Sequence, residues 1–139
     1  MRVRVKVRII ASGSQVTTSA LVNSGFESEE PDICIPMEVA RLLRLWPRRE
    51  VESVGTFTAG GEVAVHILGS GRLQLLVDSE VKSEIVCNLM MNPYVDEVLL
   101  SDYVIDELGI IVVSFRRGLW RHVSDEPSIV RSSAEPEHW

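Results

Sequence analysis

The sequence lacks the features of several large protein classes. No apolar run approaches the roughly 18 residues that a membrane-spanning helix needs, and the N-terminal segment MRVRVKVRII alternates charge with valine instead of forming the apolar centre of a secretory signal. No dense basic cluster offsets the formal net charge of −6, which argues against binding to a nucleic-acid backbone. We therefore expect a soluble cytoplasmic protein that binds neither membranes nor nucleic acids.

Metal-binding residues are also few and scattered. The two cysteines, Cys34 and Cys87, have no CxxC neighbour, and the histidines His66, His122 and His138 lack the spacing of a ligand set. The sequence therefore predicts no metal site and no cofactor. In an ordinary cytosol both thiols would be reduced and buried as small apolar side chains, whereas in a hyperthermophile they could form a disulfide.

The length leaves little room for more than one domain. A chain of 139 residues with 45% hydrophobic residues can bury one core. The stretch from 124 to 139 contains two prolines, four acidic residues and one arginine, which is typical of a flexible segment. We predict a folded domain over residues 1–123 and a flexible acidic tail over 124–139.

Most of the predicted elements are strands. Residues 2–10 alternate Arg or Lys with Val or Ile, the period-two pattern of a half-buried strand. Turn residues at 12–15 separate it from a second predicted strand at 16–22, so the chain should open with a hairpin. From Val51 to Cys87, further strands are expected in a meander whose turns lie at 59–61, 69–71 and 78–80.

Two short helices are also predicted. The first lies between Pro36, which suits a first helical turn, and Pro47, which ends it. The second begins after Ser101, a residue able to cap a helix, and ends at Gly109. A strand follows at 110–113. The fold class is therefore mostly β with one or two short helices.

Three further features gain meaning from their order. An apolar strand ends in Asn23-Ser24-Gly25, a tripeptide that by itself is an ordinary β-turn. The Gly60-Gly61 hairpin tip follows about 35 residues later, and Val98-Leu99-Leu100-Ser101 then leads directly into a helix. This order resembles the retropepsin-like aspartic proteases, where an apolar strand ends in Asp-Thr-Gly or Asp-Ser-Gly, a glycine-rich flap follows, and two hydrophobic residues plus glycine precede a helix.

The resemblance covers roughly residues 3–121 and implies a retropepsin-like acid protease fold. It also includes residues 35–43, which are similar to the family's helix after the active-site loop, and residues 104–110, which are similar to its C-terminal helix and strand. The implied activity is that of an aspartic endopeptidase acting on extended peptides.

The resemblance also implies roles for individual residues. Asn23, Ser24 and Gly25 occupy the catalytic triplet. Glu27 and Ser28 resemble the residues that bind the substrate backbone, although a solvated acidic loop would look the same. Thr58, Ala59, Gly60 and Gly61 belong to the hairpin that would act as the flap over the substrate.

One departure from the family decides what activity to expect. Aspartic protease chemistry needs two carboxyl groups that share a proton, one acting as a base towards water and the other polarising the scissile carbonyl. Asn23 stands where the family has its aspartate, and an amide cannot accept a proton from water. The chain should therefore be very weak or inactive as a protease. The second departure, Ser101 in place of glycine, is a change between small residues.

Several alternatives remain at this point. An engineered Asp-to-Asn replacement and a natural loss of the carboxylate would give the same sequence, and the intact surroundings of Asn23 favour a replacement or a recent loss. A non-catalytic peptide-binding or dimerisation module would also keep this pattern. A third interpretation is an unrelated small β-barrel with an accidental resemblance.

The number of triplets predicts the assembly. One chain carries one triplet, so two copies must meet to form a site, and a C2 homodimer meets this requirement. In the family the hydroxyl at the position of Ser24 bonds across the dyad, and Gly25 leaves room for close approach. We expect a homodimer joined by edge strands near the chain ends, with a peptide or protein as its substrate.

Overall fold

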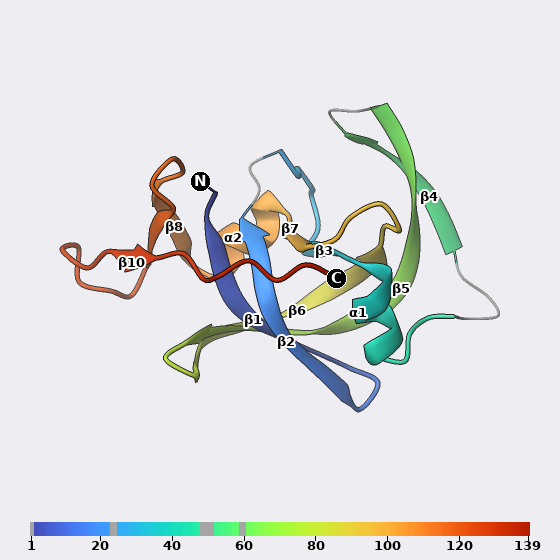
Figure 1. Ribbon diagram of the computed structural model, residues 1–139, viewed down its shortest axis with the longest axis horizontal. Helices are drawn as coiled ribbons and strands as arrows, with labels where there is room; N and C mark the ends of the chain where they lie inside the picture. The colour runs from blue at the N-terminus through green and yellow to red at the C-terminus, as the bar shows by residue number, and fades with distance from the viewer. Residues whose placement is uncertain (1, 23–24, 48–51, 59–60) are drawn as a thin grey trace.

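Figure 1 shows the computed structural model of the chain. It describes residues 2–22, 25–47, 52–58 and 61–139, and for 52–58 and 61–64 it describes the backbone alone. The described elements are β1 (Arg4–Ala11), β2 (Ser14–Val22), β3 (Asp32–Ile35), α1 (Met37–Leu42), β4 (Glu52–Thr58), β5 (Gly61–Val77), β6 (Glu80–Met91), β7 (Val98–Leu100), α2 (Asp102–Glu107), β8 (Ile110–Ser114), β9 (Leu119–His122) and β10 (Arg131–Ser132).

Six strands form a closed barrel. Their order is β1-β2-β7-β3-β6-β5, and pairing between β1 and β5 closes the ring. β4 pairs with the first half of β5 outside this ring, and β8, β9 and β10 form a separate three-stranded sheet. The prediction of a mostly β fold with two short helices is confirmed (Figure 1). Among the described residues, no helix is long and apolar enough to cross a membrane.

The opening hairpin follows the predicted pattern. The alternate apolar side chains of β1, Val5, Val7 and Ile9, are almost fully buried, while the basic residues between them are partly exposed. β1 pairs with β2 from Arg4↔Leu21 to Ala11↔Ser14. Ser12 and Gly13 connect the strands with φ angles of 51° and 77°, and such positive angles match the twist of a two-residue hairpin turn.

Both helices are present and shorter than their predicted segments. Pro36 precedes α1, and Arg44, with a φ of 61°, lies just beyond its end. The hydroxyl of Ser101 accepts a hydrogen bond from the Val104 N–H at 3.4 Å, so Ser101 caps α2 as predicted. Gly109 follows α2 with a φ of 79°.

The predicted turn at residues 69–71 is wrong. β5 continues through this segment for 17 residues and pairs with β6 on both sides of it. The register shifts between Ile67 and Gly69, which marks a β-bulge. A Cβ at Gly71 would lie 2.8 Å from the carbonyl oxygen of Ile10 on β1. Gly69 therefore permits the bulge, and Gly71 permits the close approach of β5 to β1. In the sequence, glycines in these two roles resemble glycines in a turn.

The C-terminal segment, for which a flexible tail was predicted, is hydrogen-bonded to the first two strands. It runs across the β1–β2 hairpin (Figure 1). The Ala134 N–H donates to the Arg4 carbonyl at 2.9 Å, the Glu137 carboxylate accepts from the Ser19 N–H at 3.2 Å, and the Trp139 indole donates to the Thr18 hydroxyl at 3.0 Å. The composition of this segment indicates only that it is polar. In the fold, its polar groups form hydrogen bonds with strands that lie more than a hundred residues away in the sequence.

Candidate functional site

Two strands that are distant in sequence end side by side at the candidate site. β2 and β7 are parallel neighbours, with Val22 paired to Leu100. The predicted triplet begins directly after Val22, and Ser101 follows Leu100. Asn23 and Ser24 themselves lie outside the described residues, whereas Gly25 is described and exposed. The strand pairing thus places side by side the two strand ends that precede these motifs in the sequence.

The loop after the triplet is attached to the start of α2. The Asp102 N–H donates to the Phe26 carbonyl at 2.8 Å, and the Ser101 N–H donates to the Asp32 carbonyl at 3.2 Å. β3, which follows the loop, lies between β7 and β6 in the barrel. Backbone hydrogen bonds therefore hold both ends of the loop against the junction between β7 and α2, where Ser101 lies.

Ser28 is fixed by two carboxylates. Its N–H donates to Asp102 Oδ1 at 2.9 Å, and its hydroxyl donates to Asp32 Oδ2 at 2.6 Å. The Asn88 amide donates to Asp32 Oδ1 at 2.9 Å, so both oxygens of this 6% exposed carboxylate are bonded. Of the two residues expected to bind the substrate backbone, Ser28 orders the loop, while Glu27 is exposed to solvent.

The sequence analysis missed this role of Asp32 and of Asp102. Neither residue was among the predicted site residues. The signal available in the sequence was the position of Asp32 directly before the apolar residues of β3. A carboxylate at the buried start of a strand needs hydrogen-bond donors, and Ser28 and Asn88 provide them.

The predicted flap coincides with the β4–β5 hairpin. Thr58 pairs with Gly61, so two residues connect the strands, while Ala59 and Gly60 lie outside the described residues. Near its base the hairpin contacts the segment after α1, where the ring centroids of Trp46 and His66 are 5.2 Å apart.

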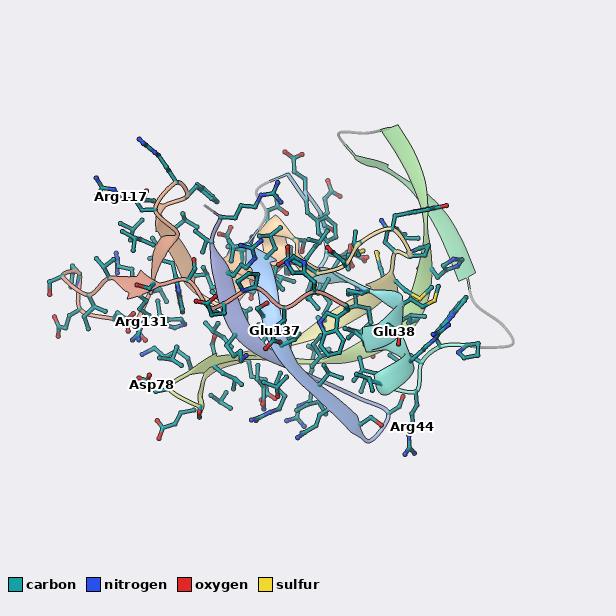
Figure 2. The ribbon with its side chains drawn as sticks, in the orientation of Figure 1. Glu38, Arg44, Asp78, Arg117, Arg131 and Glu137 are labelled. Carbon is teal, nitrogen blue, oxygen red and sulfur yellow. The ribbon has the colours of Figure 1, made fainter. Side chains whose placement is uncertain are left out.

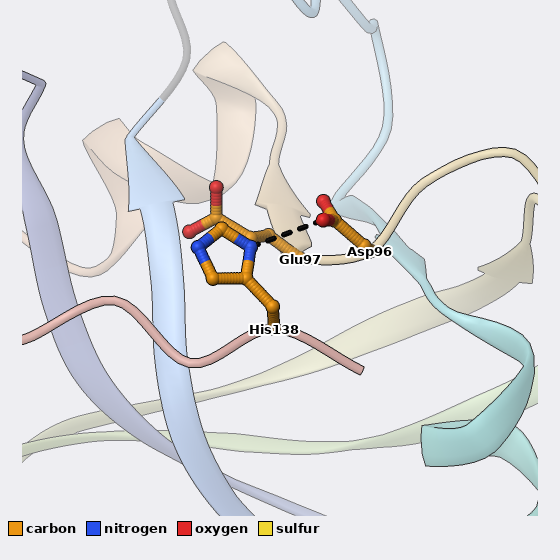
Figure 3. A group of neighbouring side chains, drawn as sticks. All are labelled: Asp96, Glu97 and His138. Atoms are coloured by element: carbon orange, nitrogen blue, oxygen red, sulfur yellow. Dashed lines mark hydrogen bonds and ion pairs between the residues drawn. The ribbon is translucent and has the colours of Figure 1, made fainter.

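A group of potential metal ligands lies elsewhere. The ligand atoms of Asp96, Glu97 and His138 are within 4.8 Å of one another (Figure 3). His138 Nδ1 lies 3.1 Å from Asp96 Oδ2, while Arg4 donates to both Glu97 oxygens at 2.7 and 3.1 Å. The Arg4 guanidinium thus already balances the buried carboxylate, which makes the group an unfavourable cation site.

Comparisons with known proteins leave the family of this chain open. No protein-family description matches the sequence, and no curated protein matches it significantly. The functional interpretation therefore rests on the arrangement of β2, β7, α2 and the β4–β5 hairpin.

Proposed function

We propose that this protein is a retropepsin-like domain that forms a homodimer and holds an extended peptide. With aspartate at position 23 it would be an aspartic endopeptidase, and with Asn23 it binds peptides without cutting them. The observation that carries the proposal is the parallel pairing of β2 and β7, with Val22 beside Leu100. In the sequence, the Asn23-Ser24-Gly25 triplet directly follows Val22, and Ser101 directly follows Leu100.

Three further observations support this function. The triplet, the hairpin and the β7–α2 unit occur in the chain order of the family. The loop that follows the triplet is hydrogen-bonded to α2 through Phe26 and Asp102. β4 has β5 as its single strand partner among the described residues. A hairpin with such a free outer edge is suited to cover a peptide and to pair with its backbone.

The proposed chemistry requires a carboxylate from each protomer. In an active dimer the two groups at position 23 would share one proton, so that one activates water while the other donates to the substrate carbonyl. Asparagine has nearly the same shape as aspartate and lacks this titration. We therefore propose that the protein with Asn23 binds peptides but does not hydrolyse them.

The second candidate function is a module that never cleaves. Asn23 is the observation that favours it, because it removes the catalytic base and leaves the neighbouring Ser24-Gly25 pair in place. This module would bind peptides or dimerise through the same surfaces. The two candidates differ in whether an aspartate at position 23 is sufficient for hydrolysis.

Asn23→Asp tests the proposal. We expect the full-length variant to cleave members of a diverse peptide library, with a mildly acidic optimum, since one carboxyl must be ionised and its partner protonated. Cleavage is measured by mass spectrometry between about pH 3 and 7, the range in which coupled carboxyls titrate. Asn23→Ala is the matched control and should be inactive. A dimeric Asn23→Asp protein that cleaves nothing would favour the non-catalytic module.

A further inference from the structure

The β8–β9 hairpin carries a basic surface on an otherwise acidic chain. Residues 110–122 contain Arg116, Arg117 and Arg121 but no aspartate or glutamate, so their formal charge is +3 with histidine neutral. Because the net charge of the whole chain is −6, the remaining residues carry −9. The hairpin projects from the barrel, and Arg117 extends from its connecting end (Figure 2). Positive charge is therefore concentrated at one projecting part of the molecule.

The three hairpin arginines have no carboxylate partners of their own. Elsewhere in the protein, Arg4, Arg72 and Arg131 each lie 2.7 Å from a carboxylate oxygen. In the part of the chain that the structure describes, the side chains of the hairpin arginines form no ion pair and no hydrogen bond. Arg116 and Arg117 are exposed. An external carboxylate could therefore bind these guanidinium groups without breaking a bond inside the protein.

Apolar side chains accompany the arginines on the outer face of the hairpin. Leu119 and Arg121 alternate with the buried Trp120 along β9, so they lie on the opposite face from it. Ile111 is the partner of Arg121 on β8, and paired residues of neighbouring strands share a face. Ile111 and Leu119 are both half-buried. The outer face is therefore partly apolar and accessible to a partner.

The connecting end of the hairpin adds two exposed apolar side chains. Val113 lies at the register shift between β8 and β9, Phe115 begins the turn, and each is 48% exposed. Scattered apolar residues on a surface are ordinary, but these two lie within nine residues of sequence that also hold the three arginines. Aromatic residues and arginine are enriched at protein interfaces. The combination indicates a surface that binds a partially apolar, negatively charged partner.

We propose that this hairpin docks an extended acidic peptide segment of a partner protein. An apolar side chain of the peptide would lie against Val113 and Phe115. Carboxylates on either side of it would accept hydrogen bonds from Arg116 and Arg117 at the turn and from Arg121 on the outer face. The planar guanidinium group suits this role because it can donate two parallel hydrogen bonds to one carboxylate.

The charge of the remaining residues favours a short peptide over a larger anionic partner. Asp106 and Glu107 are exposed on α2, which directly precedes β8, and Glu126 is exposed shortly after β9. A nucleic acid or an anionic membrane extends past the hairpin and would approach these groups, whereas five extended residues span only about 17 Å. None of residues 110–122 belongs to the candidate peptide site, so the docking surface is independent of the proposed protease-like function.

Two peptides that differ only in charge test the proposal. The probes are Glu-Glu-Val-Glu-Glu and Gln-Gln-Val-Gln-Gln, both with blocked ends. In ¹H–¹⁵N spectra of the full-length protein at low ionic strength, we expect the acidic peptide to shift the Phe115 and Gly118 amide signals in a saturable manner. It should bind about tenfold more tightly than the neutral peptide, because several exposed ion pairs add small contributions. Equal affinity, or no shift at millimolar peptide, would overturn the proposal.

Variants with equal charge changes locate the binding surface. Arg116→Gln combined with Arg117→Gln should weaken binding of the acidic peptide about fivefold. Arg2→Gln combined with Arg41→Gln removes the same charge from two exposed residues outside the hairpin and should leave the affinity nearly unchanged. Phe115→Ala should also weaken binding, and thermal unfolding confirms that each variant is folded. Equal weakening by the two double variants would show that only overall charge matters and would overturn the proposal.

Two further results would assign the hairpin to a different partner. If the protein bound vesicles containing phosphatidylserine but not the acidic peptide, the hairpin would be a lipid-binding surface. If Arg116→Gln combined with Arg117→Gln changed the mass in sedimentation equilibrium, the hairpin would be a contact between copies of this chain. Either result would overturn peptide docking, whereas an Asn23→Asp protein that cleaves nothing would leave the docking proposal intact.

Discussion

Val22 and Leu100 lie side by side at the ends of two parallel strands, although 78 positions of sequence separate them. Each strand is followed at once by a motif of the candidate site, the triplet in one case and Ser101 with α2 in the other. Hydrogen bonds from Ser101 and Asp102 to the loop at 26–32 add a second connection. The strands and the loop that flank the candidate site are therefore part of the barrel wall or are bonded to it.

The proposed site requires two chains. We expect sedimentation equilibrium to give a mass of about 31 kDa, twice the 15.5 kDa of one chain. Light scattering at tens of micromolar provides an independent measurement. A strict monomer in both experiments would rule out the dimer.

The flap prediction concerns Gly60 and Gly61. Replacing both with valine should weaken peptide binding by the Asn23 protein, because β-branched residues fit poorly in a tight turn and would narrow access to the site. Binding is measured by fluorescence anisotropy with peptides that the Asn23→Asp protein cleaves. Dimer mass should not change. Equal peptide affinity with and without the valines, in folded dimers, would show that this hairpin is an ordinary surface turn.

Glu137 should contribute a pH-dependent part of the stability. Burial disfavours its charge, but hydrogen bonds from Lys6 and the Ser19 N–H outweigh burial and lower the pKa of Glu137 below its usual value. Its stabilisation is therefore complete above the unfolded-state pKa and disappears as the pH falls through the lower folded-state pKa. Because the Glu137 side chain is 39% exposed, we expect Glu137→Gln to cost only about 0.5–1 kcal/mol at pH 7.

Urea unfolding at pH 7 and at pH 3 measures the difference in the free energy of unfolding between the original protein and Glu137→Gln. This difference should be smaller at the lower pH. Hydrogen exchange at the Ser19 amide should accelerate in Glu137→Gln. Glu135→Gln is the matched control, since Glu135 is exposed in the same segment. If the two variants exchange and unfold alike, the Glu137 contacts do not hold the C-terminal segment.

The two cysteines should be unreactive in the native protein. Both are free and buried, as the sequence led us to expect, and burial raises the pKa of Cys34 and of Cys87 to about 12. Since the thiolate is the reactive form, a chromogenic disulfide reagent at pH 8 should detect no thiol until urea is added, and then two. Rapid labelling of the folded protein would contradict the burial of these residues.

The sequence by itself determined the local structure. Alternation in residues 2–10 specified β1, the Ser12-Gly13 turn specified the hairpin, and Ser101 and Gly109 bounded α2. These features depend on interactions between residues that are close in the chain, so a one-dimensional pattern can reveal them. The same local reasoning failed at residues 69–71, because glycines at a bulge and glycines at a turn look alike.

Only the tertiary structure decided which segments meet. The pairing of β2 with β7, the burial of Asp32 between Ser28 and Asn88, and the docking of the C-terminal segment on Thr18 and Ser19 all join distant residues. A polar residue gives no sign in the sequence of whether water or a distant donor will satisfy it. That outcome depends on barrel closure, which places Arg4 and Ser19 beside residues from the far end of the chain.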